Sequence, residues 1–286
     1  MPTRLVLVSG HIFGRRAYEG IFSSAAWLEG NLEVPLMIGL PAAKAPGTVG
    51  YAGLADLAAE QGADFAEAKD PTLRASADRI RACAPDYLLV IGWSRLIPPE
   101  VLAVPAAGAI GMHPTRLPFG RGQAPIPWTI IKGLDSTALS VFLLRAGADT
   151  GPLIAQYELP VRPRETSASL FHRVGHTHFT AGHDLAERLS ASRPEGTPQN
   201  DAEATRWPKR RPADGRLDHA MTYPEIDALV RAQLGPYPRA FVALDGQDIP
   251  VRGARLSPGP ESKLEELLPR TVRFGCADGV AELTRD

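Results

Sequence analysis

The sequence lacks several features that mark common classes of protein. It contains only two cysteines, Cys83 and Cys276, and they are far apart, without the CxxC spacing of a zinc or redox site. No apolar run approaches the roughly 18 residues of a transmembrane helix, and the apolar run at the N-terminus is too short for a signal peptide. We therefore expect a cytoplasmic protein with no disulfide framework and no membrane span.

The near-zero net charge and the absence of several catalytic motifs exclude further classes of protein. The formal net charge is -1 and the pI is about 6.7, so no long-range basic field for nucleic acid is expected. The sequence has no GxGxxG, no GxSxG and no Walker-type lysine loop. His172, His176, His178 and His183 lie on one predicted helix, but Arg173 stands where HExxH requires Glu, so we expect no metal site.

What the sequence does contain is an alternation of short apolar runs and helical patterns. Strands are predicted at Leu5–Ser9, Val34–Leu40, Asp86–Ile91 and Ala109–Ile110, and helices at Arg15–Glu29, Leu54–Gln61 and Leu73–Cys83. Such alternation predicts an α/β fold with a doubly wound, Rossmann-like sheet. Ligands bind such sheets at the carboxyl ends of the strands, so we expect Gly92-Trp93 and His113 to face one crevice.

The second half of the chain changes character. Further elements are predicted as a helix at Pro127–Lys132, strands at Thr137–Leu144 and Leu153–Leu159, a Ser-capped helix at Ser167–Ala191, a helix at Tyr223–Ala232, and strands at Ala240–Leu244, Ile249–Leu256, Thr271–Cys276 and Val280–Thr284. We expect a catalytic domain over 1–192, a linker over 193–214 and a small β-rich, OB-like domain over 215–286. The basic stretch Arg206–Arg216 is either a solvated linker or a contact to an anionic substrate.

The segment from Gly111 to Gly151 concentrates the residues with catalytic chemistry. His113 follows an apolar strand, and Asp149 lies in a Gly-Ala-Asp-Thr-Gly loop. Imidazole is suited to proton transfer near neutral pH, and a carboxylate beside it orients the ring. A structural histidine and a turn-forming aspartate are the alternatives for the same residues.

Three motifs in this segment are specific when taken together. They are His113-Pro114-Thr115-x-Leu117-Pro118, Arg121-Gly122-x-x-Pro125-Ile126-x-Trp128 and Asp149-x-Gly151. The sequence thereby resembles the N10-formyltetrahydrofolate-dependent formyltransferases. Pro85–Trp93 resembles the family's folate-pocket strand, and Pro208–Asp218, Leu229–Ala232 and Pro236–Phe241 resemble the linker and C-terminal domain of its methionyl-tRNA and sugar-nucleotide branches.

The resemblance implies formyl transfer from N10-formyltetrahydrofolate to a primary amine of a small acceptor, with a nucleotide-linked amino sugar as our first choice. His113, supported by Asp149, would stabilise the tetrahedral intermediate and help to move the amine proton towards N10. The family has Asn-x-His, and its Asn helps to hold the formyl oxygen; Gly111 takes that position here. The loss of one such donor costs on the order of 10²–10³ in rate. Candidate replacements are a water in the space left by Gly111, protonated His113, and Gln123.

The resemblance also assigns binding residues by motif position. The expected folate contacts are Leu88, Gly92, Trp93, Ser94, Arg95, Leu96, Ile97, Arg145, Gly147 and Ala148, with backbone groups reading the pterin edge. The expected acceptor contacts are Gly10, His11, Arg121, Gly122, Gln123 and Pro125, and the turn through Arg121-Gly122 would be the wall behind the formyl group. Trp93 fits a core aromatic equally well.

Several other functions remain open on the sequence. Methionyl-tRNA formylation predicts a more basic surface than this charge balance gives, so nucleic acid is not the expected partner. Hydrolysis of formyl-folate, N-formylation of an amino-acid or siderophore precursor, and a silent folate- or nucleotide-binding role are the further alternatives. Homodimerisation is also left open.

Overall fold

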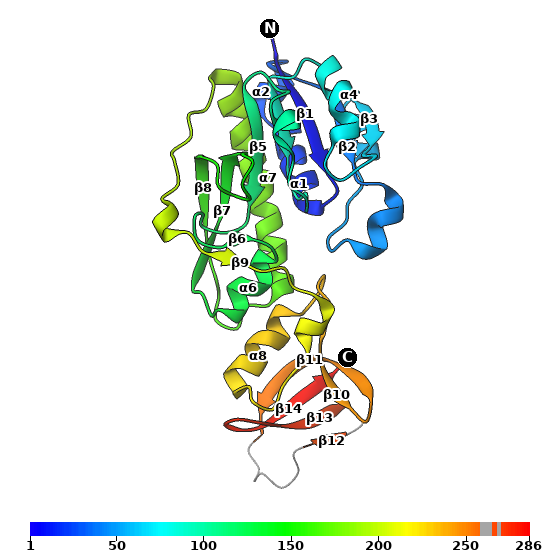
Figure 1. Ribbon diagram of the computed structural model, residues 1–286, viewed down its shortest axis with the longest axis vertical. Helices are drawn as coiled ribbons and strands as arrows, with labels where there is room; N and C mark the ends of the chain where they lie inside the picture. Colours follow the sequence, from blue (N-terminus) through cyan, green and yellow to red (C-terminus); the bar gives the residue numbers. More distant parts are fainter. Residues whose placement is uncertain (258–264, 268–269) are drawn as a thin grey trace. The chain divides into compact units, whose positions relative to one another are not determined.

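The computed structural model describes residues 1–257, 265–267 and 270–286 (Figure 1). The chain forms two compact units, each assembled from three segments. The first unit contains residues 1–122, 138–159 and 173–206, and the second contains residues 123–137, 160–172 and 207–286. Among the described residues, no helix is long and apolar enough to cross a membrane.

The first unit is built on a seven-stranded sheet. In spatial order its strands are β3 (Asp64–Glu67), β2 (Leu32–Gly39), β1 (Thr3–Ser9), β4 (Tyr87–Val90), β5 (Gly108–His113), β7 (Ser136–Leu143) and β8 (Leu153–Pro160). The strands from β3 to β5 are parallel, whereas β7 is antiparallel to β5. The carboxyl ends of β1, β4 and β5 therefore meet at one edge of the sheet.

Helices accompany this sheet in the order that the sequence predicts for a doubly wound fold, which is thereby confirmed. They are α1 (Ile12–Phe22), α2 (Ala25–Leu28), α3 (Ala55–Glu60), α4 (Ala77–Ala82), α5 (Pro99–Leu102) and α7 (Ser167–Ala191), with 3-10 turns at Ala42–Gly47, Arg74–Ser76 and Asp201–Glu203. On one face, Ile80 and Val101 pack in a cluster with Val8. Leu7, which alternates with Val8 along β1, is equally buried, so both faces are covered.

Two local predictions need correction, and one strand was missed. The helix expected over Arg15–Glu29 is interrupted between α1 and α2, because the Ser24 hydroxyl accepts a hydrogen bond from the Trp27 N–H and starts a new helix. Thr166 rather than Ser167 caps α7, since the Thr166 hydroxyl accepts from the Ser169 N–H while the Ser167 hydroxyl donates to the Leu234 carbonyl. The short edge strand β3 was not predicted.

The second unit packs helices against an antiparallel sheet. Its helices are α6 (Pro125–Ile131) and α8 (Tyr223–Ala232), with a 3-10 turn at Pro212–Gly215, and its five strands lie in the order β10 (Ala240–Leu244), β11 (Gln247–Leu256), β14 (Gly279–Arg285), β13 (Thr271–Cys276) and β12 (Glu265–Leu267). Ile226 and Val230 of α8 share a core with Phe274. The predicted β-rich C-terminal part is confirmed, and its OB-like character stays a prediction.

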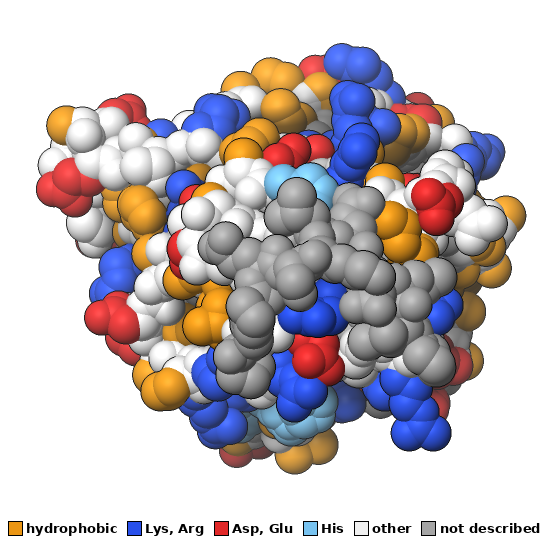
Figure 2. All heavy atoms as spheres, turned by 90° about the horizontal axis from the view of Figure 1, so that it is seen from below, with side chains coloured by type: hydrophobic (Ala, Val, Ile, Leu, Met, Phe, Trp, Pro, Cys, Tyr) orange, Lys and Arg blue, Asp and Glu red, His pale blue; other side chains and the backbone are white. Residues whose placement is uncertain are grey.

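The surface seen from below carries charges of both signs. Figure 2 shows Lys and Arg side chains interspersed with Asp, Glu and apolar side chains on this view of the described residues. A separate two-stranded sheet is formed by β6 (Arg121–Gly122) and β9 (Arg206–Trp207). Strand β6 belongs to the segment from Gly111 to Gly151 that the sequence singles out.

Candidate active site

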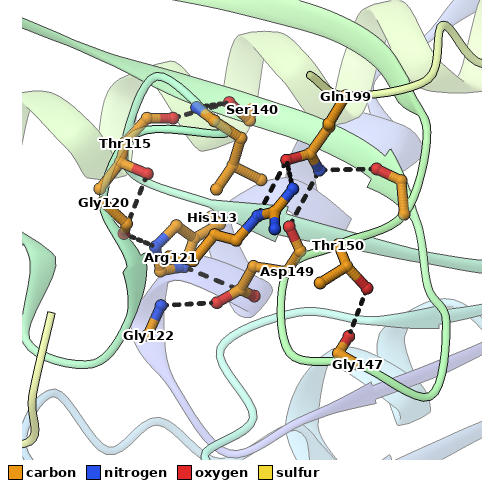
Figure 3. A network of polar contacts seen from close by, with 12 residues as sticks. His113, Thr115, Gly120, Arg121, Gly122, Ser140, Gly147, Asp149, Thr150 and Gln199 are labelled. Carbon is orange, nitrogen blue, oxygen red and sulfur yellow. Dashed lines mark hydrogen bonds and ion pairs between the residues drawn. The ribbon is translucent and has the colours of Figure 1, made fainter. Parts of the chain in front are cut away.

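His113 lies at the carboxyl end of β5, where the buried run of that strand ends. Its ring is largely buried, its Nε2 lies 2.9 Å from the Gly120 carbonyl oxygen, and its Nδ1 lies 3.9 Å from Oδ1 of Asp149 (Figure 3). A carbonyl oxygen only accepts, so we assign a hydrogen to Nε2. The distance to Asp149 is an ion-pair distance and is too long for a direct hydrogen bond. His113 and Asp149, which the sequence predicts to act as a pair, therefore lie close together but are not directly hydrogen-bonded.

Asp149 reaches His113 from the loop that joins β7 to β8. Its backbone has φ +57°, in the left-handed region, and its Oδ2 accepts a hydrogen bond of 2.8 Å from the Gly122 N–H. An aspartate tolerates this conformation better than most residues, although it still costs about 1 kcal/mol. One carboxylate oxygen is thus fixed by Gly122, and the other faces His113. The turn-forming alternative does not account for these contacts, because the carboxylate bonds to a distant segment.

Gly111 lies two residues before His113 and therefore on the same face of β5. A Cβ atom at Gly111 would lie 2.7 Å from Cδ2 of Leu144 and 3.5 Å from Cζ of Phe142. Leu144 thus fills the space in which the sequence analysis placed a water. The nearest atoms are apolar and would offer a water few partners, which argues against that candidate for the missing donor.

The carboxyl ends of β1 and β4 also lie close together. Gly92 has φ +64°, and a Cβ there would lie 2.6 Å from Cβ of His11. His11 caps α1, its Nδ1 accepting from the Phe13 N–H, and Phe13 stacks on His178 of α7 with ring centroids 4.6 Å apart. Burial lowers the pKa of His11 to about 4 and that of His178 to about 3. Both rings are therefore neutral at pH 7.

The predicted folate-binding residues in β4 and in the turn after it divide into two groups. Leu88 and Ile97 are buried in the hydrophobic core, and Trp93 packs against that core while its Nε1 donates to the Pro71 carbonyl at 2.8 Å. In contrast, the residues from Ser94 to Leu96 are exposed. The exposed turn from Ser94 to Leu96 can therefore contact a ligand directly, through its backbone. The buried residues can only support this turn from below.

The remaining predicted residues are distributed as follows. Gly147 and Thr150 close the loop before Gly151, because the Thr150 hydroxyl donates to the Gly147 carbonyl at 3.1 Å. The exposed Arg145 and the half-buried Ala148 belong to the same loop. Gly10 lies at the end of β1, whereas Gln123 and Pro125 belong to the second unit. Arg121 is buried, and its guanidinium binds Gln199 and Asp201.

Two residues of the site were missed by sequence reasoning. Gln199 donates to the Asp149 and Gly151 carbonyls, and the Thr205 hydroxyl accepts from the Gly120 N–H at 2.8 Å. Both lie in the segment 193–214, which was predicted to be a linker between domains. No local pattern marks them, because their partners are some 50 and 85 residues away in the chain. Of the seven histidines in the chain, none joins a metal-binding group in the described residues, where no three His, Cys, Asp or Glu side chains are so arranged.

Comparison with known proteins identifies the region that contains this site. Residues 51–184, which include Gly111, His113 and Asp149, match the family model described as formyl transferase. This region of the chain is similar to formyl transferases. A methionyl-tRNA formyltransferase from Koribacter versatilis is 34% identical to it over 177 residues, which are 62% of this chain and 56% of that protein.

Solved structures extend the likeness to the fold of the whole chain. HypX from Aquifex aeolicus, solved in complex with tetrahydrofolic acid, has a TM-score of 0.66 and 18% identity, over 99% of this chain and 44% of HypX. An N-formyltransferase from Helicobacter canadensis, solved with folinic acid and dTDP-3-aminofucose, has a TM-score of 0.71 and 14% identity, over 100% of this chain and 99% of that one. The predicted resemblance to formyltransferases is confirmed. The chain spans about half the length of the first two relatives named.

Proposed function

We propose that this protein transfers the formyl group of N10-formyltetrahydrofolate to a primary amine of a small acceptor, such as a nucleotide-linked amino sugar. The observation that carries the proposal is the pair His113 and Asp149 within the region similar to formyl transferases, 3.9 Å apart. The relative from Helicobacter canadensis, solved with a nucleotide-linked amino sugar, supports this acceptor class.

The exposed segments fit a folate in charge as well as in position. Arg95 follows β4 and Arg145 follows β7, and both are exposed. Their positive charges suit the glutamate carboxylates of a folate, and the exposed backbone around Ser94 offers groups to a pterin edge. When bound, the folate supplies the formyl carbon.

The chemistry that these residues can perform follows from their contacts. A neutral amine forms a new bond to the formyl carbon, the bond from that carbon to N10 breaks, and the amine proton is transferred to N10. His113 handles this proton and, when protonated, donates to the formyl oxygen. Asp149, whose Oδ1 lies 3.9 Å from Nδ1 of His113, balances the charge of the ring when His113 is protonated. Since Gly111 offers no side-chain donor, His113 takes the larger share of the stabilisation of that oxygen.

Basic side chains in the second unit favour an anionic acceptor. Lys132 Nζ lies 5.6 Å from the centre of the Trp128 ring, and Arg210 Cζ lies 5.1 Å from the same centre. Burial lowers the pKa of Arg210. Both cations lie near the Trp128 ring, and a phosphate of the acceptor would balance their charge. Nucleotide sugars and tRNA both carry phosphate.

Formylation of methionyl-tRNA is the second candidate, favoured by the 34% identity to the Koribacter versatilis enzyme. The test incubates the protein with N10-formyltetrahydrofolate and either nucleotide-linked amino sugars, methionyl-tRNA or no acceptor, and follows both N-formyl product and folate release. We expect product from an amino sugar, and a rate about 10²–10⁴-fold lower in His113→Ala.

Each other outcome assigns a different function. Product from tRNA alone identifies the second candidate. Folate release without acceptor, at the rate seen with the best amine, indicates a hydrolase. An unchanged rate in His113→Ala removes the proposed chemistry. Folate binding without turnover in any of the three mixtures indicates a binding protein.

A further inference from the structure

Gln199 uses the full hydrogen-bonding capacity of its side-chain amide inside the candidate active site. Its Nε2 donates to the carbonyl oxygens of Asp149 at 2.9 Å and Gly151 at 2.7 Å (Figure 3). Its Oε1 accepts from Nε of Arg121 at 3.1 Å and from Nη2 of the same residue at 2.8 Å. An amide offers two hydrogens and two lone pairs, so every one of them is engaged.

These four bonds join the two segments that hold the Asp149 carboxylate. One segment is the backbone of Asp149 and Gly151, and the other is β6, where Gly122 donates to Oδ2 of Asp149. Arg121 precedes Gly122, so the guanidinium that binds Gln199 and the N–H that binds the carboxylate come from neighbouring residues. Gln199 therefore links the main chain of Asp149 to the segment that fixes the side chain of Asp149.

Asp149 needs this support because its conformation is unfavourable by itself. A non-glycine residue at φ +57° is retained only where the surrounding contacts over-determine it. The carboxylate already lies 3.9 Å from His113 Nδ1, so a small rotation of the loop separates the two groups beyond useful contact. The bonds from Gln199 act directly on the peptide groups that such a rotation would move.

The segment that carries Gln199 is itself anchored at both ends. Thr197 exchanges two backbone hydrogen bonds of 2.8 Å with Leu153, at the start of β8. Thr205 accepts from the Arg121 N–H at 3.0 Å, and its hydroxyl accepts from the Gly120 N–H. Residues 197–205 of the predicted linker thus form a strap that is hydrogen-bonded at both ends to segments around His113.

We propose that Gln199 is a positioning residue that holds Asp149 at its working distance from His113. This inference rests on the proposed function for its catalytic consequence. Asp201, which accepts from Nη2 of Arg121 at 2.7 Å, holds the same guanidinium from the exposed side. Gln199 touches no reacting atom, so it acts only through Asp149.

The first experiment compares Gln199→Ala and Gln199→Glu with wild type in formyl transfer. The Glu variant keeps acceptors for Arg121 but loses both donated hydrogens and faces two carbonyl oxygens with a charge. We expect kcat to fall about 10- to 100-fold in both variants with KM for the amine little changed, because displacement of a catalytic group by about 1 Å has that effect. Gln247→Ala removes an exposed glutamine from β11 and is the matched control, with unchanged kcat.

A double-mutant cycle separates positioning from general destabilisation. In an Asp149→Asn background, Gln199→Ala should have little additional effect on kcat, because the residue through which it acts is already lost. A full additional loss in that background would overturn the proposal. Retention of wild-type kcat by Gln199→Glu would also overturn it, because the bonds to the loop would then be unnecessary.

A readout that needs no substrate keeps this inference separate from the proposed function. Long-range ¹H–¹⁵N spectra of the His113 ring report its contact with Asp149, and Asp149→Asn provides the reference change. We expect Gln199→Ala to reproduce that change while Gln247→Ala leaves the His113 signals in place. Wild-type signals in Gln199→Ala would refute positioning. Absence of formyl transfer in wild type, with the expected spectra, would refute the proposed function alone.

Discussion

Gly151 lies directly against the main chain of Leu143, so that a Cβ atom at residue 151 would stand 1.6 Å from the Leu143 carbonyl oxygen. No side chain fits there, because the atom in the way belongs to the backbone of β7. We predict that Gly151→Ala displaces the loop carrying Asp149 and lowers kcat by about 10²-fold or more, since a displacement of about 1 Å has that effect. Steady-state kinetics of the soluble Gly151→Ala variant and of wild type measure the change in kcat.

The control for that prediction is Gly53→Ala, where a Cβ would meet nothing nearer than the Tyr51 hydroxyl at 3.9 Å. This variant should keep wild-type kcat. Wild-type turnover by Gly151→Ala would show that the loop can shift without consequence for Asp149, and would contradict the assignment of that loop to the site.

Two glycines of α7 should respond in opposite directions to the same substitution. At Gly175 a Cβ would make ordinary contact with the Phe13 ring, at 3.9 Å and beyond, whereas at Gly182 it would lie 1.9 Å from the Ala17 carbonyl oxygen. In a helix interior alanine is favoured over glycine by about 1 kcal/mol. We predict that Gly175→Ala raises the free energy of unfolding by up to about 1 kcal/mol, while Gly182→Ala lowers it.

Chemical denaturation of both variants beside wild type checks this pair. The physical reason for the difference is that α1 and α7 approach closely at Gly182, so an added methyl group must separate the helices. Equal effects of the two substitutions, in either direction, would contradict the close approach of α1 to α7.

The buried histidines make stability depend on pH. The pKa of His178 is lowered to about 3 by burial first and then by the nearby His11 and His113, against about 6.5 in the unfolded chain. Its contribution is complete above pH 6.5 and is lost as the pH falls, because the unfolded state then binds the extra proton. Between pH 7 and pH 5 we expect His178 to account for a loss of about 2 kcal/mol.

The measurement is the free energy of unfolding at both pH values in wild type and in His178→Gln. Glutamine does not titrate, so the difference between the two pH values should shrink by about that amount, whatever the variant does to stability at pH 7. Carboxylates contribute equally in both proteins and cancel. An undiminished pH dependence in the variant would show that His178 is not held neutral by burial.

The parts of this fold that could be predicted are those whose signals are local. The apolar runs of β1, β4 and β5 and the periodicity of α8 are local signals, and the bounds of α8 were predicted to the residue. The break at Ser24 was missed because a serine inside a helical pattern is also compatible with a continuous helix. The edge strand β3 was missed because its four residues carry no run of buried side chains.

The residues of the candidate site also divide into those that a local sequence signal marks and those that it does not. His113 and Asp149 could be proposed as a pair because they belong to specific motifs, and the structure places them 3.9 Å apart. Gln199 could not be found, since its four bonds depend on where the loop of Asp149 and β6 lie in space. The position of Leu144 beside Gly111 likewise depends on packing, so it cannot be predicted from the motif.

That packing predicts how an asparagine donor could be restored. Gly111→Asn alone places its Cβ 2.7 Å from Cδ2 of Leu144, so the leucine side chain must move before the asparagine can fit, and we expect kcat to rise little. Leu144→Ala removes the obstructing atoms at a cost of about 2–5 kcal/mol at a fully buried site, and less here because Leu144 is only partly buried. We therefore predict that the double variant has a higher kcat than Leu144→Ala alone.

The comparison is made between the double variant and Leu144→Ala, because both lack the leucine and differ only at residue 111. One well-placed donor to the formyl oxygen is worth up to 10²–10³ in rate, and a new, unoptimised one should give a smaller fraction, about 10-fold. Single-turnover formyl transfer measures it. A lower rate in the double variant than in Leu144→Ala would indicate that His113 already holds the formyl oxygen in a position that an asparagine at residue 111 disturbs.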